Sequence, residues 1–242
     1  MADGTGATRF LEWDGCHNTR DLHLPGGPAP AVLVRSDRVT ALTAVGWEAL
    51  LDHGVRTVID LRNPDETAAD THTAPRPPAV TTLHVPLDGI EHRDFWDVWW
   101  GTPGFGSPEY YVPFLRRFPE RIADVARAVA HAGPGGVLFH CALGRDRTGL
   151  IALVLLRLAG AEPDRIAADH ALSDSRMPAW HAAHGRAYDP GPVEARMAEL
   201  GTTGRELARR AAEWLDAPGY LRYGGLDADE LRALRGRLEG DA

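Results

Sequence analysis

Apolar positions along the chain follow two different spacings, which predict strands and helices in turn. The segment VRTVIDL at 55–61 is short, apolar and rich in β-branched residues, which is typical of a buried strand. The segment 40–54 before it has apolar residues at helical spacing, a threonine to cap its start and Gly54 to end it. Further strands are expected at 80–87 and 136–140, and further helices at 121–133 and 148–160.

The order of these elements predicts an α/β fold with a central, mostly parallel sheet flanked by helices, because strands alternate with helices along the chain. From Pro163 onward the pattern is helical, with apolar stripes at 164–176, 192–201, 205–216 and 227–240. Since no repeat or long linker interrupts the chain, we expect a single domain over 1–242 with a helical C-terminal portion at about 163–242.

Two stretches lack a regular period. Residues 71–79 are rich in proline and predict an irregular connection. Residues 88–114 place three tryptophans among many turn residues. This pattern favours a loop or broken helix that covers the core over a lid that closes on a substrate.

Composition and charge narrow the classes of function. The 242 residues are 44% hydrophobic and 25% charged, as in ordinary globular proteins, and the net charge is −8. An acidic chain argues against general binding of nucleic acid or anionic membranes, so any anion site must be local. All 26 basic residues are arginines, which we interpret as compositional bias.

Targeting signals are not evident in the sequence. The longest apolar run, 150–159, is too short to span a bilayer, so no integral membrane segment is expected. The segment MADGTGATRF has no basic patch followed by an apolar core, so no secretory signal is expected either. We therefore expect a cytoplasmic protein.

The two cysteines, Cys16 and Cys141, lack the spacing of metal ligands. A disulfide between them needs an oxidising compartment, and in the cytoplasm Cys141 stays a free thiol. Cys16 could form a disulfide with an oxidised Cys141, but an unrelated buried thiol is the simpler interpretation. His181 and His184 in HAAH lack the spacing and the glutamate of a metalloprotease motif, so neither a metal nor another cofactor is expected.

The chemistry concentrates in HCALGRDRTG at 140–149, between an apolar strand and an apolar helix. Backbone N–H groups of a short loop at a helix N-terminus favour an anion. Arg147 follows Cys141 by six positions, and its planar guanidinium can donate two parallel hydrogen bonds to a phosphate. Helix amides and arginines lower a cysteine pKa, which predicts a nucleophilic thiolate at Cys141 rather than an inert buried thiol.

The residues around the cysteine suit the same purpose. Gly144 would let the backbone approach the anion, and the Thr148 hydroxyl could donate to the thiolate. His140 more plausibly fixes the loop than transfers protons. The residues expected to bind the phosphate group are Ala142, Leu143, Gly144, Arg145, Thr148 and Gly149.

The motif H-C-x-x-G-x-x-R-T-G resembles the signature of cysteine-dependent protein tyrosine phosphatases. GRDRTG, with Asp146 directly before the arginine, resembles more narrowly the bacterial tyrosine/serine phosphatases. Other segments agree with that family, so that the resemblance runs from about Asn18 to Leu238. These segments are HNTRDL at 17–22, LVRSDRVTAL at 33–42, VRTVIDLRNPDE at 55–66, DHALSD at 169–174 and GYLRYGGLDADELRALRGRL at 219–238.

The resemblance implies the phosphatase α/β fold, with the site at the carboxyl end of strand 136–140. It also implies that Asp146 is the general acid, although Asp88 and Asp60 are other carboxylates that could approach the site. Two positions depart from the family pattern. Arg145 replaces a lysine that the family associates with phosphoinositides and mixed protein substrates, and Thr19 replaces an aromatic residue.

The function expected from these features is metal-independent hydrolysis of phosphomonoesters through a phosphocysteine intermediate. The substrate could be a phosphotyrosine or phosphoserine protein, or a small molecule such as a phosphoinositide or another metabolite. Phosphate, sulfate and vanadate are expected to bind in the loop. A rhodanese-like sulfurtransferase fits less well, because its loops hold four residues between cysteine and arginine and this chain has five. A silent phosphate-binding module is a third alternative.

Overall fold

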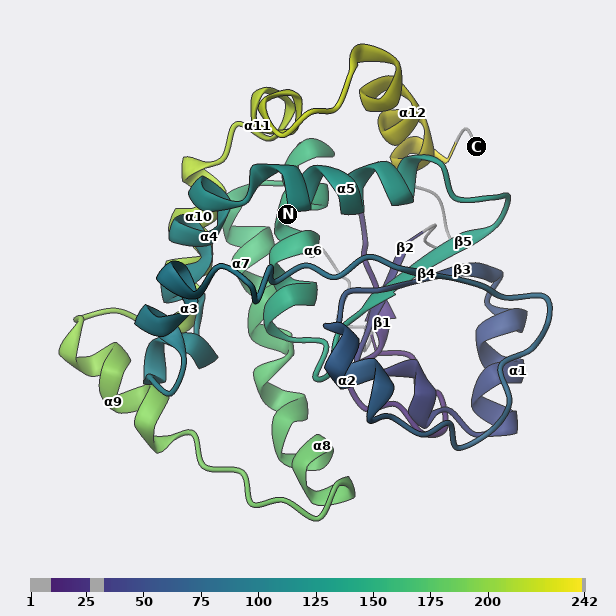
Figure 1. Cartoon of the computed structure of the whole chain (residues 1–242), viewed down its shortest axis with the longest axis horizontal. Coiled ribbons are helices and arrows are strands. Elements are labelled where there is room, and N and C mark those ends of the chain that lie inside the picture. Colours follow the sequence, from purple (N-terminus) through teal and green to yellow (C-terminus); the bar gives the residue numbers. More distant parts are fainter. Residues whose placement is uncertain (1–9, 27–32, 241–242) are drawn as a thin grey trace, which may run out of the picture.

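A central sheet organises the computed structural model, which describes residues 10–26 and 33–240 (Figure 1). Within these residues the sheet has five strands in the order β1-β2-β5-β3-β4. Strand β1 pairs antiparallel with β2, and the other neighbouring pairs are parallel. The expected α/β fold with a mostly parallel sheet is therefore confirmed. The strands are β1 (Arg20–Asp21), β2 (Leu33–Ser36), β3 (Val55–Asp60), β4 (Thr81–His84) and β5 (Gly136–His140).

The register aligns the carboxyl ends of the central strands. His140, the last residue of β5, pairs with Ser36 at the end of β2 and with Asp60 at the end of β3. Open α/β sheets bind ligands beyond the carboxyl ends of their strands. The loop that starts at Cys141 therefore emerges between the ends of two neighbouring strands.

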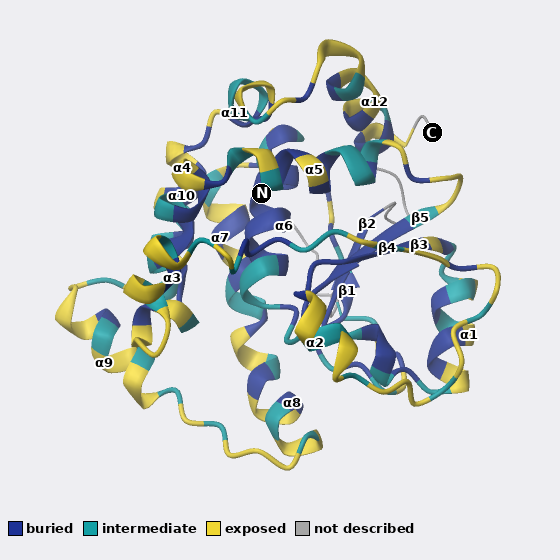
Figure 2. Ribbon diagram, viewed as in Figure 1, coloured by how far each residue is buried: buried dark blue, intermediate teal, exposed yellow. Residues whose placement is uncertain are grey.

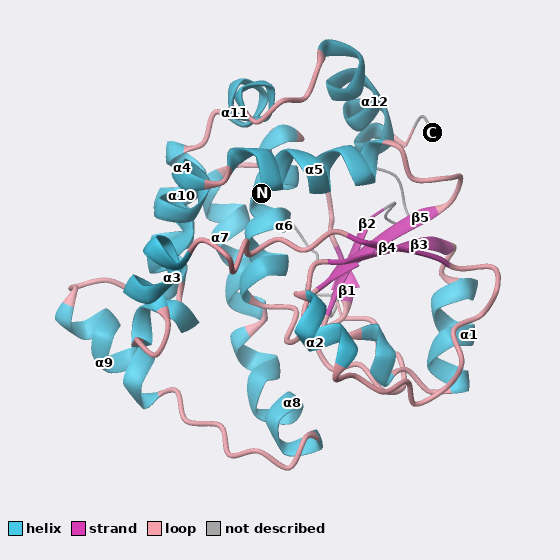
Figure 3. Cartoon of the chain, viewed as in Figure 1, coloured by secondary structure: helices cyan, strands magenta, loops and turns pink. Residues whose placement is uncertain are grey.

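Helices cover both faces of the sheet, as Figure 3 shows. They begin and end as follows: α1 (Ala44–Asp52), α2 (Pro64–Ala68), α3 (Arg93–Trp99), α4 (Tyr111–Arg117), α5 (Pro119–Ala130), α6 (Asp146–Leu158), α7 (Pro163–Leu172), α8 (Met177–Ala183), α9 (Gly191–Glu199), α10 (Gly204–Trp214), α11 (Ala217–Tyr223) and α12 (Ala228–Glu239). Short 3-10 turns η1 (Val39–Ala41), η2 (Pro103–Gly106), η3 (Pro108–Tyr110) and η4 (Asp174–Arg176) connect some of them.

The sheet separates two apolar cores, because side chains of a strand alternate between its faces. Val58 and Leu138 belong to the smaller core, together with Trp47 of α1. Ile59 and Phe139, one position further along, belong to the larger core with α5 and α6. Helix α6 is buried almost all round (Figure 2). Its apolar sequence therefore reflects its position in the larger core.

The C-terminal helices pack onto the helices of the larger core. Helix α10 packs against α7, and α11 and α12 pack against α5. Asp227 caps α12 in a capping box with Glu230, which satisfies N–H groups at the start of that helix. At its other end, Arg237 donates to the carbonyl oxygen of Gly135 just before β5. The C-terminal segment thus supports strand β5, which leads directly to Cys141.

Most predicted elements lie where the pattern put them, with ends shifted by a few residues. Residues 71–79 form no helix or strand, as expected, and 88–114 is broken into α3, η2, η3 and the start of α4. Trp96 and Phe114 from this stretch lie in the larger core, so it covers the core as expected. Strands β1 and β2 and helices α2, α8 and α11 had no clear periodicity, because each is seven residues or shorter.

Two expectations concern the chain's relation to membranes and secretion. Among the described residues, no helix is long and apolar enough to cross a bilayer. Nine of the ten N-terminal residues in which no secretory signal was expected, 1–9, lie outside the described part.

A pair of identical substitutions tests the role of α6. Val154 in α6 is 1% exposed and Val45 in α1 is 64% exposed. We expect Val154→Ala to lower the free energy of unfolding by about 2 kcal/mol, because it removes buried methyl groups and leaves a cavity. Val45→Ala should change it by less than about 0.5 kcal/mol. Denaturant unfolding measures both, and equal effects would contradict the assignment of α6 to the core.

Candidate active site

Cys141 lies directly after β5, and the N-terminus of α6 begins five residues later. Cys141 is 3% exposed, and the Thr148 hydroxyl donates to its Sγ at 3.2 Å. No side chain caps the start of α6. The free N–H groups of this helix end therefore face the loop that carries the thiol.

Three carbonyl groups of the loop accept hydrogen bonds from the far side of the loop. The Ala142 carbonyl accepts from the Arg38 N–H at 3.2 Å, and the Leu143 carbonyl from Asn18 Nδ2 at 2.9 Å. The Gly144 carbonyl accepts from Arg35 Nη2 at 2.7 Å. These bonds turn the carbonyl oxygens away from the inside of the loop.

The other carbonyls of the loop are bound as well. His140 Nδ1 donates to the Cys141 carbonyl at 3.0 Å, and the Tyr111 hydroxyl donates to the Asp146 carbonyl at 3.0 Å. The Arg145 carbonyl accepts from the Gly149 N–H inside α6. In the described part of the chain, the N–H groups of residues 142–145 donate to no backbone acceptor. A ring of unpaired N–H groups is the arrangement that binds an anion.

A buried ionic network holds the donors of these bonds in place. Arg20 and Arg35 are both fully buried, and both contact Asp169 of α7. Arg20 also donates to Asn18 Oδ1 at 2.7 Å, which fixes the amide that binds the loop. Ser173 accepts from Arg20 at 3.0 Å. Residues from the N-terminal segment, β2 and α7 therefore meet behind the loop.

Gly144 and Gly149 are required for close packing. Gly144 has φ +67°, and a Cβ at this position would lie 2.5 Å from the Ser36 carbonyl oxygen. The sequence argument expected Gly144 to leave room for the anion, but it is the β2 backbone that occupies this space. A Cβ on Gly149 would lie 2.7 Å from the Tyr111 hydroxyl, so this glycine also serves packing.

Two acidic residues hold Arg147, one from the segment after β3 and one from the segment after β4. Glu66 of α2 accepts from Nη1 at 2.5 Å and from Nη2 at 2.8 Å. Asp88 lies 3.2 Å from Nη1 and accepts a hydrogen bond from Asn63 at 2.9 Å. Although burial opposes the charged forms, the pKa of Arg147 is raised by Asp88 and Glu66, and the pKa of Glu66 is lowered by Arg147. The guanidinium is therefore charged and held in one orientation.

The three candidate acids differ in their surroundings. Burial raises the pKa of Asp146 and of Asp88, against the opposing charge of Arg147. For Asp60, burial is outweighed by His140 and Arg62, which lower its pKa. Arg62 donates to Asp60 at 2.7 Å. Asp60 is therefore a fixed carboxylate, whereas Asp146 and Asp88 are disposed to hold a proton.

Asp146 and Asp88 also differ in how firmly they are held. The Asp88 side chain is 11% exposed and bonded to Asn63. The Asp146 side chain is 27% exposed, and its Oδ1, which is buried, has no hydrogen-bond partner among the described residues. Asp146 is the acid with more freedom to reach a substrate.

The remaining predicted residues lie at the edge of the loop. Ala142 and Leu143 are half-buried within it. Arg145 points away from Arg147, donating to Asp174 at 2.9 Å and to the Gly106 carbonyl at 2.7 Å. The Arg145 side chain thus binds η4 and the Gly106 carbonyl, whereas the Arg147 side chain binds Glu66 of α2.

His140 and Cys16 lie behind the loop. Burial lowers the pKa of His140, which is 3.7 Å from Asp60. Cys16 and Cys141 are both free, and they belong to different apolar cores. No disulfide therefore joins them in this structure. Burial and the nearby Asp37 raise the pKa of Cys16 well above its usual value, which keeps that thiol protonated.

The histidines of HAAH lie in α8 and at its end. The His184 ring stacks on Trp180 with 4.0 Å between ring centroids. His184 Nδ1 donates to the Trp180 carbonyl at 2.6 Å. Among the described residues, no group of three or more His, Cys, Asp and Glu side chains is placed to hold a metal ion.

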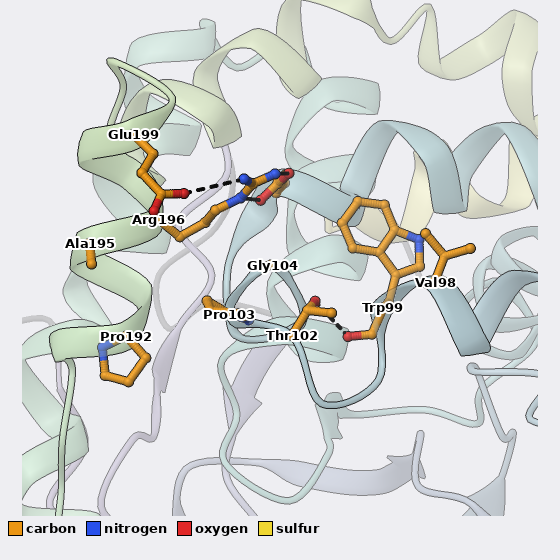
Figure 4. Close-up of a pocket in the computed structure, with 10 residues that line it drawn as sticks. Val98, Trp99, Thr102, Pro103, Gly104, Pro192, Ala195, Arg196 and Glu199 are labelled. Carbon is orange, nitrogen blue, oxygen red and sulfur yellow. Dashed lines mark hydrogen bonds and ion pairs between the residues drawn. The ribbon is translucent and has the colours of Figure 1, made fainter.

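A pocket of about 650 Å³ lies between the α3–η2 region and α9 (Figure 4). Trp99 forms one wall of this pocket. Arg196, which also lines the pocket, binds Glu109 at 2.7 Å and contacts Glu199 at 3.5 Å. No residue of 140–149 lines this pocket, so it is separate from the cysteine loop.

Comparison with known proteins identifies the family to which this site belongs. Residues 11–240 match the model of the tyrosine phosphatase family. The chain belongs to the tyrosine phosphatase family. It is therefore an enzyme of the protein tyrosine phosphatase type.

Two curated relatives are bacterial phosphatases. A tyrosine-protein phosphatase of Nostoc commune is 33% identical over 225 residues, which cover 87% of this chain and 75% of that protein. The triple specificity protein phosphatase PtpB of Mycobacterium tuberculosis is 27% identical, over 95% of this chain and 99% of that protein. Among solved structures, P. aeruginosa TpbA matches with a TM-score of 0.41 and 16% identity, over 89% of this chain and 99% of that chain.

The sequence argument did not single out the residues that hold the loop. Glu66, Asn18, Arg35 and Asp169 all lie in segments that carried the family resemblance, but no role was assigned to them. Their partners lie up to 149 positions away along the chain. The recurrence of polar residues in those segments is the signal that could have pointed to them.

Two glycine substitutions test the geometry of the loop. We expect Gly144→Ala to lower the free energy of unfolding by about 2 kcal/mol or more, because the residue has φ +67° and its Cβ would meet the β2 backbone. Gly236→Ala in α12 is the control, since nothing lies within 4 Å of a Cβ there. That change should raise the free energy of unfolding by about 0.5–1 kcal/mol. Denaturant unfolding gives both values, and effects of the same sign would contradict this packing.

Proposed function

We propose that this phosphatase hydrolyses phosphomonoesters without a metal ion, through a phosphocysteine formed on Cys141. The observation that carries the proposal is the orientation of the loop, in which each carbonyl from Cys141 to Asp146 is bound elsewhere. The N–H groups of the loop are then free for the three non-bridging phosphate oxygens. The same loop is expected to bind free phosphate, sulfate and vanadate.

Arg147 completes the anion site in this proposal. Glu66 occupies one end of its guanidinium through Nη1 and Nη2. The other edge of the guanidinium, formed by Nε–H and the second Nη2–H, remains for two phosphate oxygens. Because Glu66 and Asp88 already orient the group, little ordering is needed when substrate binds.

The first chemical step forms the phosphocysteine. The Cys141 thiolate attacks phosphorus, an S–P bond forms and the P–O bond to the leaving group breaks. Asp146 gives its proton to the leaving oxygen, so the alcohol departs neutral. The raised pKa of Asp146 supports this role, since more of the acid form is present near neutral pH than for an ordinary aspartate.

The second step releases phosphate. Water attacks phosphorus while the Asp146 carboxylate accepts a proton from it, and the S–P bond breaks. The electron pair returns to Cys141 as a thiolate. Thr148 supports this step, because its hydroxyl at 3.2 Å from Sγ can stabilise the developing negative charge on sulfur.

The proposal also covers the substrates, the cellular compartment and the residues that make up the domain. The substrates are phosphorylated proteins, on tyrosine or serine, or small phosphorylated molecules including phosphoinositides. A reducing cytoplasm suits the mechanism, because it keeps Cys141 a thiol. We also propose that 163–242 is part of one phosphatase domain, since α10, α11 and α12 pack on α7 and α5. The five residues between Cys141 and Arg147 continue to argue against a sulfurtransferase.

Replacing the nucleophile tests the mechanism. With 4-nitrophenyl phosphate as substrate, we expect Cys141→Ser to lower kcat at least about 1000-fold, because the serine hydroxyl stays protonated at neutral pH and is a poor nucleophile. A chelator should leave the wild-type rate unchanged. Phosphate release that survives Cys141→Ser, or that stops with chelator, would count against a phosphocysteine.

Replacing the acid tests the role of Asp146. Asp146→Asn should lower kcat about 100-fold or more for alkyl phosphates and less for 4-nitrophenyl phosphate, whose leaving group hardly needs a proton. Because Asp146 works protonated in the first step, the wild-type rate on alkyl phosphates should fall as pH rises through its raised pKa. That decline should vanish in Asp146→Asn.

Asp88→Asn provides the comparison for this experiment. If Asp88 is the acid, the decline at rising pH is lost in Asp88→Asn and kept in Asp146→Asn. An equal loss of rate on aryl and alkyl phosphates in Asp146→Asn would also exclude Asp146 as the proton donor.

A further inference from the structure

A second pocket, of about 680 Å³, begins at the phosphatase loop itself. Arg145, which directly precedes Asp146, forms one side of it. Further walls come from Asp174, from the segment 187–190 and from α9, and the lining is completed by Ser107, His181 and the segment 202–204. Its volume lies within the range of ordinary ligand pockets. We call it the Arg145 pocket.

The Arg145 pocket lies on the leaving-group side of the proposed reaction. Asp146 Oδ1 is 4.0 Å from Arg145 Nη1, so the proposed acid and the pocket wall are neighbours. The leaving oxygen must approach Asp146 in the first step. The part of the substrate that carries this oxygen therefore extends toward the Arg145 pocket.

The charge of the pocket is negative. Among the residues that the structure describes, Arg145 is the single arginine lining it, and Asp174 pairs with that arginine at 2.9 Å. Asp189 and Glu194 add two carboxylates that form no ion pair with another described residue. Burial, Arg186 and His184 lower the pKa of His181, which also lines the pocket, so that it stays neutral at pH 7. Polyanionic substrates are disfavoured here, and a cation is favoured.

Apolar groups lie beside these carboxylates. Tyr188 offers an aromatic ring, and Val193 and Met197 of α9 offer aliphatic surface. An arginine or lysine side chain can lay its stem along apolar surface and place its charge near a ring or carboxylate. An inositol phosphate has neither the stem nor the positive charge.

We propose that the Arg145 pocket binds a basic side chain next to the phosphorylated residue of a peptide substrate. This inference rests on the proposed function and narrows it to phosphoproteins with basic flanking sequence. In this proposal Arg145 forms a wall of the pocket and does not bind a second phosphate, because its guanidinium is already bound to Asp174 and to the Gly106 carbonyl.

The test compares three phosphotyrosine peptides of equal length, with arginine, alanine or glutamate beside the phosphotyrosine. For each protein variant, the kcat/KM values of the peptides are divided by its kcat/KM for 4-nitrophenyl phosphate. We expect kcat/KM to be about 3- to 10-fold higher for the arginine peptide than for the alanine peptide, and lowest for the glutamate peptide. Inositol phosphates should be poorer substrates than the arginine peptide.

The double variant Asp189→Asn/Glu194→Gln should bring the arginine-to-alanine ratio close to one. Its matched control is Glu48→Gln/Asp52→Asn, which removes two exposed carboxylates of α1 outside the pocket and should keep the wild-type ratio. A wild-type ratio of one or below, or an unchanged ratio in the pocket variant, overturns the proposal.

Binding separates this inference from the proposed mechanism. The Kd of each peptide for the Cys141→Ser protein, measured by calorimetry, should follow the same order and the same response to the pocket variant. If the wild-type protein releases no phosphate but the Kd values follow this order, the pocket proposal holds and the proposed mechanism fails. If the wild-type protein releases phosphate but neither kcat/KM nor Kd shows the preference, the mechanism holds and the pocket proposal fails.

Discussion

The structure depends on the buried contact between Arg20, Arg35 and Asp169. Two cations and one carboxylate lie in the interior, where removal of one partner costs about 3–5 kcal/mol. The network is useful because of where its remaining donors point. Arg35 binds the Gly144 carbonyl, and Arg20 fixes Asn18, which binds the Leu143 carbonyl. The backbone conformation that exposes the loop's N–H groups is therefore set from behind.

This arrangement explains why the site needs so much of the chain. An anion site made only of N–H groups at a helix end can relax when empty, because peptide units can rotate toward water. Here rotation would leave N–H donors of the fully buried Arg35 and Asn18 side chains without an acceptor, which costs free energy. The network draws on the N-terminal segment, β2 and α7, so the form of the loop depends on the packing of these elements against one another.

The sequence predicted the centre of the site better than its support. The spacing of Cys141, Gly144, Thr148 and Arg147 is local, and both flanking elements have strong apolar periodicity. The elements around 55–61 and 136–160 were accordingly placed within about two residues. The support joins residues far apart along the chain, such as Arg20 and Asp169, and no local pattern encodes such pairs. Arg145 illustrates the difference, since its partners Asp174 and the Gly106 carbonyl follow only from tertiary packing.

The same contrast applies to charge within the site. Arg147 and Arg145 are two positions apart, yet one is held by Glu66 and Asp88 and the other by Asp174. Because they lie at the start of a helix, their side chains leave in different directions, and each meets a different wall of the fold. Both arginines are therefore paired with carboxylates, but they are held against different walls, Arg147 beside α2 and Arg145 beside η4. Under the proposed binding of a basic side chain, the groups that a substrate meets beyond its phosphate are Asp189 and Glu194, and selectivity then belongs to the α8–α9 region rather than to the signature loop.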